Sequence, residues 1–185
     1  VLFLLNLFLG SVHIPMDSIW NILWGLDGDE SVIWQNIIWK SRIPQSLTAL
    51  VAGAGLAVSG LQMQTVFRNP LAGPSVLGIS SGASLGVAFV VLLSGSIGGI
   101  ALSRLGFMGE IALTVAAIVG ALSVMALIVY VSQKVHGNVT LLIIGVMIGY
   151  VANAVIGVLK FFSVEEDIRA YVIWGLGSFA RVSGN

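Results

Sequence analysis

The sequence contains no cysteine, only two histidines and few charged residues. Without cysteine, the chain has no disulfide framework, thiolate metal site or cysteine nucleophile. Charged residues make up 9% of the chain, whereas they are about a quarter of a soluble protein, and the formal net charge is +0. No basic surface therefore indicates nucleic acid as a partner. What remains is a chain with 57% hydrophobic residues and a mean hydropathy of +1.04, which is typical of an integral membrane protein.

The most informative stretch is an uncharged run over 43–67, which Arg42 precedes. Ser41 is placed to cap this run as a helix, and Pro44 lies in its first turn, where a missing N–H costs nothing. At 1.5 Å per residue the run gives roughly 37 Å of helix, which crosses a bilayer core of about 30 Å. The run breaks at Arg68-Asn69-Pro70-Leu71, and a second uncharged run follows. This pattern predicts a membrane hairpin.

The other uncharged runs predict an all-α, polytopic helical bundle in a single membrane domain. The expected parts are the end of a first helix over 1–9, an interfacial segment over 10–42, helices over 43–67, 75–93, 111–131 and 141–159, and a polar segment over 160–185. The segment 1–9 is not read as a signal peptide, because no basic region or cleavage site accompanies it. Four of the five tryptophans, at positions 20, 24, 34 and 39, indicate that the segment 10–42 lies at the membrane–water interface.

Small residues recur along two of the predicted helices. On the helix over 43–67, Gly53, Ala57, Gly60 and Gln64 share one face, and Gly145, Gly149 and Asn153 recur every four residues on the helix over 141–159. Small residues let helix backbones approach closely, so both rows are expected to pack against other helices. For Gln64 and Asn153, a place along a transport pathway remains the alternative to a hydrogen bond between helices.

The pattern Gly78-Ile79-Ser80-Ser81-Gly82 fits the serine hydrolase motif G-x-S-x-G. That motif needs a strand–turn–helix elbow and a nearby histidine, whereas this run opens a predicted membrane helix. We therefore favour serines that pack between helices, with an intramembrane serine protease as an unlikely alternative. The acidic run at 165–167 is expected to be a solvated helix start and not a metal site. No glycine-rich phosphate loop with its lysine is present, so any ATP is expected to bind another chain.

Several motifs, taken together and in order, resemble one known family. They are R-I-P at 42–44, A-G-A-G-L-A-V-S-G at 52–60, Gln64, R-N-P-L-A-G-P at 68–74 and L-G-I-S-S-G-A at 77–83, with weaker matches at 10–15, 141–149 and 174–178. This series resembles the permease subunits of bacterial iron-complex and cobalamin importers, the FecCD/BtuC-like family of ABC transporters. Members have about ten transmembrane helices, so the resemblance implies a BtuC-like bundle of which about five are present here, as the N-terminal half.

The resemblance implies a permease in the bacterial inner membrane that passes an iron–siderophore, heme or cobalamin into the cytoplasm. It implies three partners besides lipid, namely a second permease subunit as homodimer or paralogue, a separate ATP-binding subunit and an extracytoplasmic substrate-binding protein. It implies no catalytic role and no cofactor for this chain. A secondary transporter or channel without an ATPase is the alternative from another class, because glycine rows and intramembrane amides suit any protein whose helices shift against one another.

Site residues follow from the same resemblance. Arg42 is implied to face outward and to pair with a glutamate of the binding protein, while Gln45 replaces a second arginine that the family often has. Asn69, Pro70 and Leu71 are implied to lie at the cytoplasmic mouth as gate residues, and Asn138 and Val139 in the next inner link are implied to face them. Lysine and arginine counting over the whole chain favours the opposite orientation, with two on the inner side and six on the outer.

Overall fold

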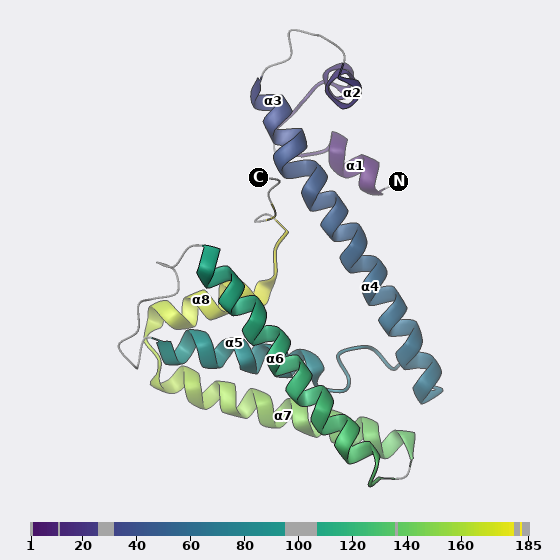
Figure 1. Cartoon of the computed structure of the whole chain (residues 1–185), viewed down its shortest axis with the longest axis vertical. Coiled ribbons are helices and arrows are strands. Elements are labelled where there is room, and N and C mark those ends of the chain that lie inside the picture. Colours follow the sequence, from purple (N-terminus) through teal and green to yellow (C-terminus); the bar gives the residue numbers. More distant parts are fainter. Residues whose placement is uncertain are drawn as a thin grey trace. The chain divides into compact units, whose positions relative to one another are not determined.

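The computed structural model describes residues 2–10, 12–25, 32–94, 107–135, 137–179 and 182, and every regular element among them is a helix. Three helices are long and apolar enough to cross a membrane, Val32–Phe67, Met108–Ser132 and Asn138–Phe162, and a shorter apolar helix covers Ile79–Leu93. The predicted all-α membrane bundle is therefore confirmed. The chain divides into two compact units, Val1–Val58 with Ser178–Asn185, and Ser59–Gly177 (Figure 1).

The first unit contains two short helices and the first part of one long, continuous helix. It comprises α1 (Leu2–Phe8), α2 (Met16–Trp24), α3 (Val32–Ile37), the π-helix η1 (Ile38–Arg42) and the beginning of α4 (Ile43–Phe67). Its core is a small cluster of four buried isoleucines: Ile14, Ile19, Ile22 and Ile38. This cluster fastens α2 to the long helix.

The long helix does not begin where the sequence pattern indicates. The bounds of α4 match the predicted run, but α3 and η1 precede it without a break, so that 36 residues form one helix. Ser41 therefore lies inside the helix and caps nothing, and the second part of the predicted interfacial segment is helical. The wide π-turn lies directly before Pro44, where the ring and the missing N–H disturb the regular ladder of an α-helix.

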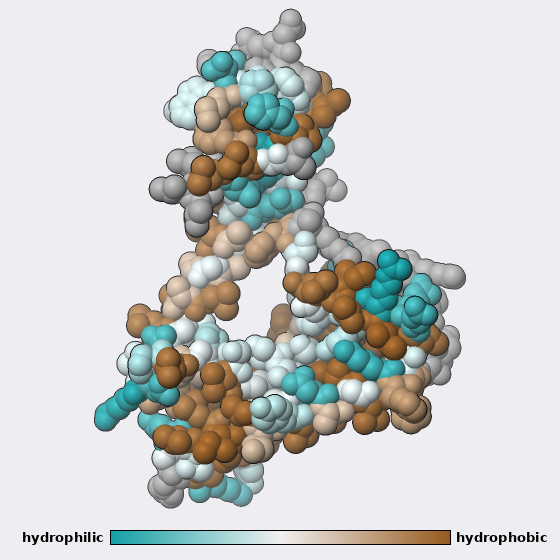
Figure 2. Space-filling view, turned by 180° about the vertical axis from the view of Figure 1, so that it is seen from behind, coloured by the Kyte–Doolittle hydropathy of each residue, from teal (hydrophilic) through white to brown (hydrophobic). Residues whose placement is uncertain are grey.

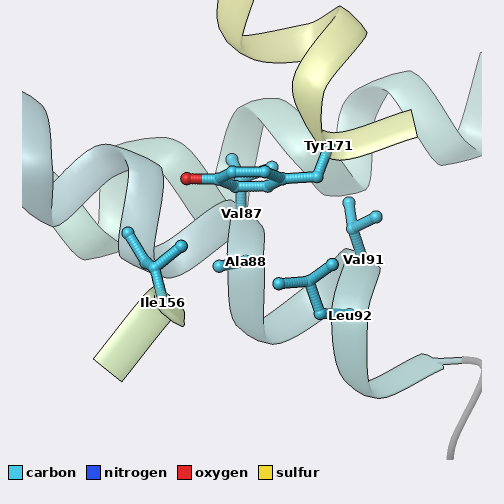
Figure 3. Close-up of a cluster of buried hydrophobic side chains, with 6 residues drawn as sticks. All are labelled: Val87, Ala88, Val91, Leu92, Ile156 and Tyr171. Atoms are coloured by element: carbon cyan, nitrogen blue, oxygen red, sulfur yellow. The ribbon is translucent and has the colours of Figure 1, made fainter. Parts of the chain in front are cut away.

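The second unit is built around α5 (Ile79–Ser94). Besides the end of α4, it contains α6 (Phe107–Ser132), α7 (Asn138–Phe162) and α8 (Glu165–Leu176), and α5 contacts all three of these. Figure 3 shows the buried cluster where α5, α7 and α8 meet, in which the Tyr171 ring of α8 covers α5 side chains beside an α7 side chain. Its members are Val87, Ala88, Val91, Leu92, Ile156 and Tyr171.

Helix bounds in this unit differ from the predictions at several ends. The third predicted helix was expected from Ser75, but α5 begins at Ile79 because the residues before it form turns, closed by a bond from Gly78 N–H to the Ser75 carbonyl. Gly78 has a φ of +73°, a backbone conformation that ends those turns and favours glycine. α6 and α7 extend beyond the predicted runs, because Glu110 and Lys160 lie within the helices near their ends.

Glycines bring α5 and α6 into backbone contact. A Cβ atom on Gly86 would overlap the Ala116 carbonyl oxygen, and one on Gly120 would overlap the Gly82 carbonyl oxygen. No side chain fits in either place, since Cβ atoms do not approach other atoms within 3.0 Å. These positions therefore require glycine for a packing reason.

Only part of the small-residue row of α7 lies in the contact with α5 and the turn before it. Gly145 and Gly149 are buried against Leu77, Gly78 and Ser81. Asn153 is exposed, and the buried stripe instead continues through Ala152 and Ile156. A step of four residues rotates roughly 40° further than one full helical turn. Residues spaced by four therefore turn away from a fixed interface after two steps. Asn153 therefore does not join Gly145 and Gly149 in this contact, and its packing role stays a prediction.

Charged and apolar side chains on the surface fit a membrane protein with polar ends. Large hydrophobic side chains are exposed along α4, α6 and α7, and Figure 2 shows hydrophobic residues spread over the visible surface.

The acidic start of α8 is only partly exposed to solvent, whereas the sequence predicts that all of it is. Glu165 and Glu166 are exposed, but Asp167 is buried, because it lies one turn before Tyr171 on the face that packs against α5.

Candidate functional site

The end of α4 is closed by a Schellman motif. Arg68 N–H donates to the Thr65 carbonyl at 3.3 Å, and Asn69 N–H donates to the Gln64 carbonyl at 3.1 Å. Arg68 occupies the left-handed position of this motif with a φ of +47°, and it is the only non-glycine residue with positive φ in the described part of the chain. An arginine there bears backbone strain that glycine avoids. The side chain of Gln64 is exposed on the same last turns.

The N-P-L link forms a tight turn with an exposed tip. Asn69 Oδ1 accepts a hydrogen bond from Leu71 N–H at 2.9 Å, and Ala72 N–H donates to the Asn69 carbonyl at 3.1 Å. Pro70 lies between these groups, at the position where its fixed φ suits a turn. Leu71 is 87% exposed, whereas Ala72 is buried in a cluster with Phe67. The turn therefore presents one leucine outward from a fixed base.

Asn138 connects the next link to this turn region. Its Nδ2 donates to the Val66 carbonyl at 3.1 Å, so the first residue of α7 caps an unpaired carbonyl at the end of α4. Val139 beside it is 69% exposed. Leu77 from the bend and Ile128 from the end of α6 pack in the same buried cluster as Phe67. The two links that hold the gate candidates thus lie at one end of the second unit.

The helix-packing candidates on α4 meet no neighbour among the described residues. Nothing lies within 4 Å of a Cβ built on Gly53 or Gly60, and Ala57 is exposed. The packing role of this face remains a prediction. The structure joins the other glycine pair, Gly145 and Gly149, to the start of α5.

Arg42 is buried, with 6% of the residue exposed, and its docking role stays a prediction. Its guanidinium donates from Nη1 to the Leu7 carbonyl and from Nη2 to the Val12 carbonyl, both at 2.5 Å. A Cβ on Gly10 lies only 2.6 Å from Nη2, so glycine leaves the space that the guanidinium fills. Two carbonyls partly replace the water that a buried cation loses. Gln45, at the place of the family's second arginine, bonds locally to Ser41 Oγ.

A second polar contact beside Arg42 was missed by sequence reasoning. Ser46 Oγ lies 2.6 Å from Asn6 Oδ1 and 2.7 Å from the Arg42 carbonyl. The signal was present, since Asn6 is the one polar residue within the apolar run 1–9 and Gly10 begins a motif of the resemblance. Together these bonds tie α1 and the segment after it to the start of α4.

The hydrolase alternative finds no support in the described geometry around Ser80. This serine is exposed in the first turn of α5, and the residues before the helix form turns, where an elbow needs a strand. In the described part of the chain, no group of three His, Asp or Glu side chains is placed to hold a metal ion.

Comparisons with known proteins match the chain over its whole length. The model of the FecCD transport family matches residues 1–185. The hemin transport system permease protein HmuU of Yersinia pestis is 36% identical over 98% of this chain and 52% of its own length. The vitamin B12 import system permease protein BtuC of Pectobacterium atrosepticum is 33% identical over 89% of this chain and 45% of its own length. The chain thus spans about half the length of these curated relatives.

A solved structure agrees with this assignment. It is an inward-facing conformation of an ABC transporter assigned to the metal-chelate type, and it matches with a TM-score of 0.75 and 27% identity over 98% of this chain and 51% of its own. A probable iron chelatin transport system permease protein of Helicobacter pylori is 40% identical over 80% of this chain. The family match and the long apolar helices lead to one conclusion: the chain belongs to the FecCD transport family, as a multi-pass helical protein of the bacterial inner membrane.

Proposed function

We propose that the whole protein is a permease subunit of a bacterial ABC importer. It passes an iron–siderophore, heme or cobalamin, received from a substrate-binding protein, into the cytoplasm. A separate subunit hydrolyses the ATP, and the permease itself is not an enzyme. Two permease subunits, identical or paralogous, enclose the pathway between them. The family and the names of its relatives for heme, vitamin B12 and iron chelates support this proposal.

The observation that carries the proposal is the match of the FecCD family model to residues 1–185. The charges at the two ends of the second unit bear on its orientation. Among its described residues, the end with the N-P-L turn and the start of α7 has Arg68 and Lys134 and no carboxylate. All the carboxylates, Glu110 and those at 165–167, lie at the start of α6 or beyond the end of α7. Lys160 and Arg169 lie at the opposite end, so the count of described lysines and arginines is two at each end and favours neither side. The cytoplasmic location of the turn in this proposal is supported by the family alone.

Leu71 and Val139 are the gate residues in this proposal. Both are exposed apolar side chains at one end of the second unit, Leu71 on the N-P-L turn and Val139 at the start of α7, beside hydrogen bonds of Asn69 and Asn138. An apolar side chain on a fixed turn suits a constriction that excludes water while closed. Asn69, Pro70 and Asn138 position these side chains, and Gln64 and Asn153 are pathway candidates on the exposed surfaces of α4 and α7.

Docking of the substrate-binding protein through Arg42 requires a change at this residue. The glutamate of the binding protein has to replace the carbonyls of Leu7 and Val12 as acceptors. A carboxylate is the stronger acceptor for a guanidinium, because both partners are charged. Docking would then release α1 from the start of α4, which couples binding outside to a movement of the helix.

Reconstitution of the full-length protein tests the proposed function. The permease is expressed with the ATP-binding subunit encoded beside it, and uptake of heme, cobalamin and a ferric siderophore into proteoliposomes is measured. We expect co-purification of the two subunits, and uptake of one compound that needs both internal ATP and the binding protein. Uptake that persists when the ATP-binding subunit is left out would instead identify a secondary transporter or channel.

A further inference from the structure

Three exposed apolar side chains form a row along α2. Met16, Trp20 and Trp24 are four residues apart and are 67%, 55% and 69% exposed, and the two indole rings lie 6.1 Å apart. The neighbouring face of the same helix buries Ile19 and Ile22. The apolar face of α2 is therefore wider than the part of it that packs against the rest of the protein. Two of the three residues on the uncovered part are tryptophans.

The position of α2 along the long helix indicates the membrane level of this row. α2 packs against Ile38, and the next two residues, Trp39 and Lys40, are exposed. The uncharged run that crosses the membrane starts five residues after Ile38, at Ile43. Tryptophan and lysine beside the end of a membrane-crossing run are typical of the lipid headgroup region. α2 thus contacts the long helix at the level of the headgroups.

The direction of α2 fits this level. Figure 1 shows α2 nearly along its own axis while the long helix runs across the picture, so α2 lies crosswise to it. When the long helix crosses the bilayer, α2 lies in the plane of the membrane surface. Met16 and Trp20 line a cavity of about 260 Å³ together with Phe8 of the apolar helix α1, so the row faces the side from which α1 approaches. Asp17 and Asn21 border the same cavity and provide its polar edge.

We propose that α2 is an interfacial anchor whose row of Met16, Trp20 and Trp24 inserts between lipid headgroups and acyl chains of the outer leaflet. On the long helix, Trp39 is exposed as well. Its indole rings supply an apolar body and one N–H donor, which suits the boundary between headgroups and acyl chains. The anchor holds the isoleucine cluster, and with it the N-terminal end of the long helix, at a fixed depth. A docked substrate-binding protein is the rival occupant.

Spin labels on the full-length protein in phosphatidylcholine nanodiscs test this proposal. Cysteines at Met16 and, as a matched control on the polar edge, Asp17 are introduced into a cysteine-free background and labelled. We expect the label at Met16 to be at least several-fold more accessible to oxygen than to a water-soluble nickel complex, and the label at Asp17 to show the reverse. Equal accessibility to the nickel complex at both positions would overturn the proposal, as would protection of Met16 only when the binding protein is added.

A measurement without labels covers the case in which a cysteine variant fails to fold. Tryptophan fluorescence of the parent protein and of the double variant Trp20→Phe with Trp24→Phe is recorded in nanodiscs that contain brominated lipid. We expect the lipid-quenched part of the emission to fall in the variant, because these two rings are in contact with lipid. An unchanged quenched part would show that lipid does not reach the row. Neither experiment depends on what the protein transports.

Discussion

At the scale of single residues, positions that carry strain or a buried charge are the most informative. Arg68 has the left-handed conformation that glycine adopts without cost, and Arg42 is a cation enclosed by carbonyl groups. The sequence indicated both as notable residues, but only as a break between helices and as an exposed cation. Neither a φ angle nor the acceptor of a guanidinium follows from a sequence pattern, because both depend on how distant segments pack.

The strain at Arg68 predicts that Arg68→Gly stabilises the protein. Glycine at a left-handed position raises the free energy of unfolding by about 1 kcal/mol relative to another residue. We therefore expect a higher melting temperature for the full-length protein in detergent. Arg68→Ala serves as the matched control, because it removes the same charge but keeps the Cβ atom. We expect it to give no increase. Equal melting temperatures for the two variants would show that the charge, and not the backbone, decides the outcome.

The contacts of Arg42 predict different results for two conservative variants. Arg42→Lys keeps the charge but cannot bond both carbonyls with a planar fork, so it is expected to lower stability by about 2 kcal/mol. Arg42→Gln is expected to lower it at least as much, and also to weaken docking of the binding protein in a pull-down. If both variants melt at the same temperature as the parent protein, the contacts of Arg42 do not tie α1 to α4. If docking is unchanged as well, Arg42 is not the docking residue.

At the scale of elements, the sequence predicted where helices exist better than it predicted where they end. Uncharged runs identify membrane helices because burying a charge in lipid is costly, whereas short turns and a π-turn depend on individual backbone hydrogen bonds. The glycine contacts of α7 were expected at Gly145 and Gly149, where the structure has them. Asn153 does not share this contact, because residues spaced by four drift around a helix and do not form a straight row.

Backbone contact between α5 and α6 predicts a severe effect of side chains at their crossing. Gly120→Val and Gly86→Val place atoms where carbonyl oxygens already lie, so we expect loss of most monodisperse protein in size-exclusion chromatography. Gly157→Val on α7 is the matched control. A Cβ at Gly157 meets nothing within 4 Å among the described residues, so we expect a normal yield. A normal yield for Gly120→Val would mean that the two helices do not approach this closely.

At the scale of the whole molecule, several surfaces have no neighbour among the described residues. The apolar side chains exposed along α4, α6 and α7 suit lipid, whereas the amides of Gln64 and Asn153 are costly there and favour further protein or a pathway beside them. Whole-chain counting of lysine and arginine favours the side opposite to the proposed one. Within the described part of the second unit the count is even, with Arg68 and Lys134 at one end and Lys160 and Arg169 at the other, so it decides nothing about the turn.

The proposed gate predicts a cross-link between two permease subunits. Leu71→Cys in a cysteine-free background is expected to form a disulfide-linked dimer under oxidation when the cytoplasmic mouth is closed, and to do so less when it is open. The dimer is measured on non-reducing gels with and without ATP. Phe161→Cys is the control, because it is 82% exposed like Leu71 but lies at the opposite end of the second unit. Equal cross-linking at both positions would argue against a gate at Leu71.

The glycine crossing has a consequence for how such a permease moves. Two helices whose backbones touch through Gly82, Gly86 and Gly120 interlock at close range, so we expect α5 and α6 to move together. A rearrangement of such a protein is then expected at connections outside this pair, with the turn over 68–78 among them.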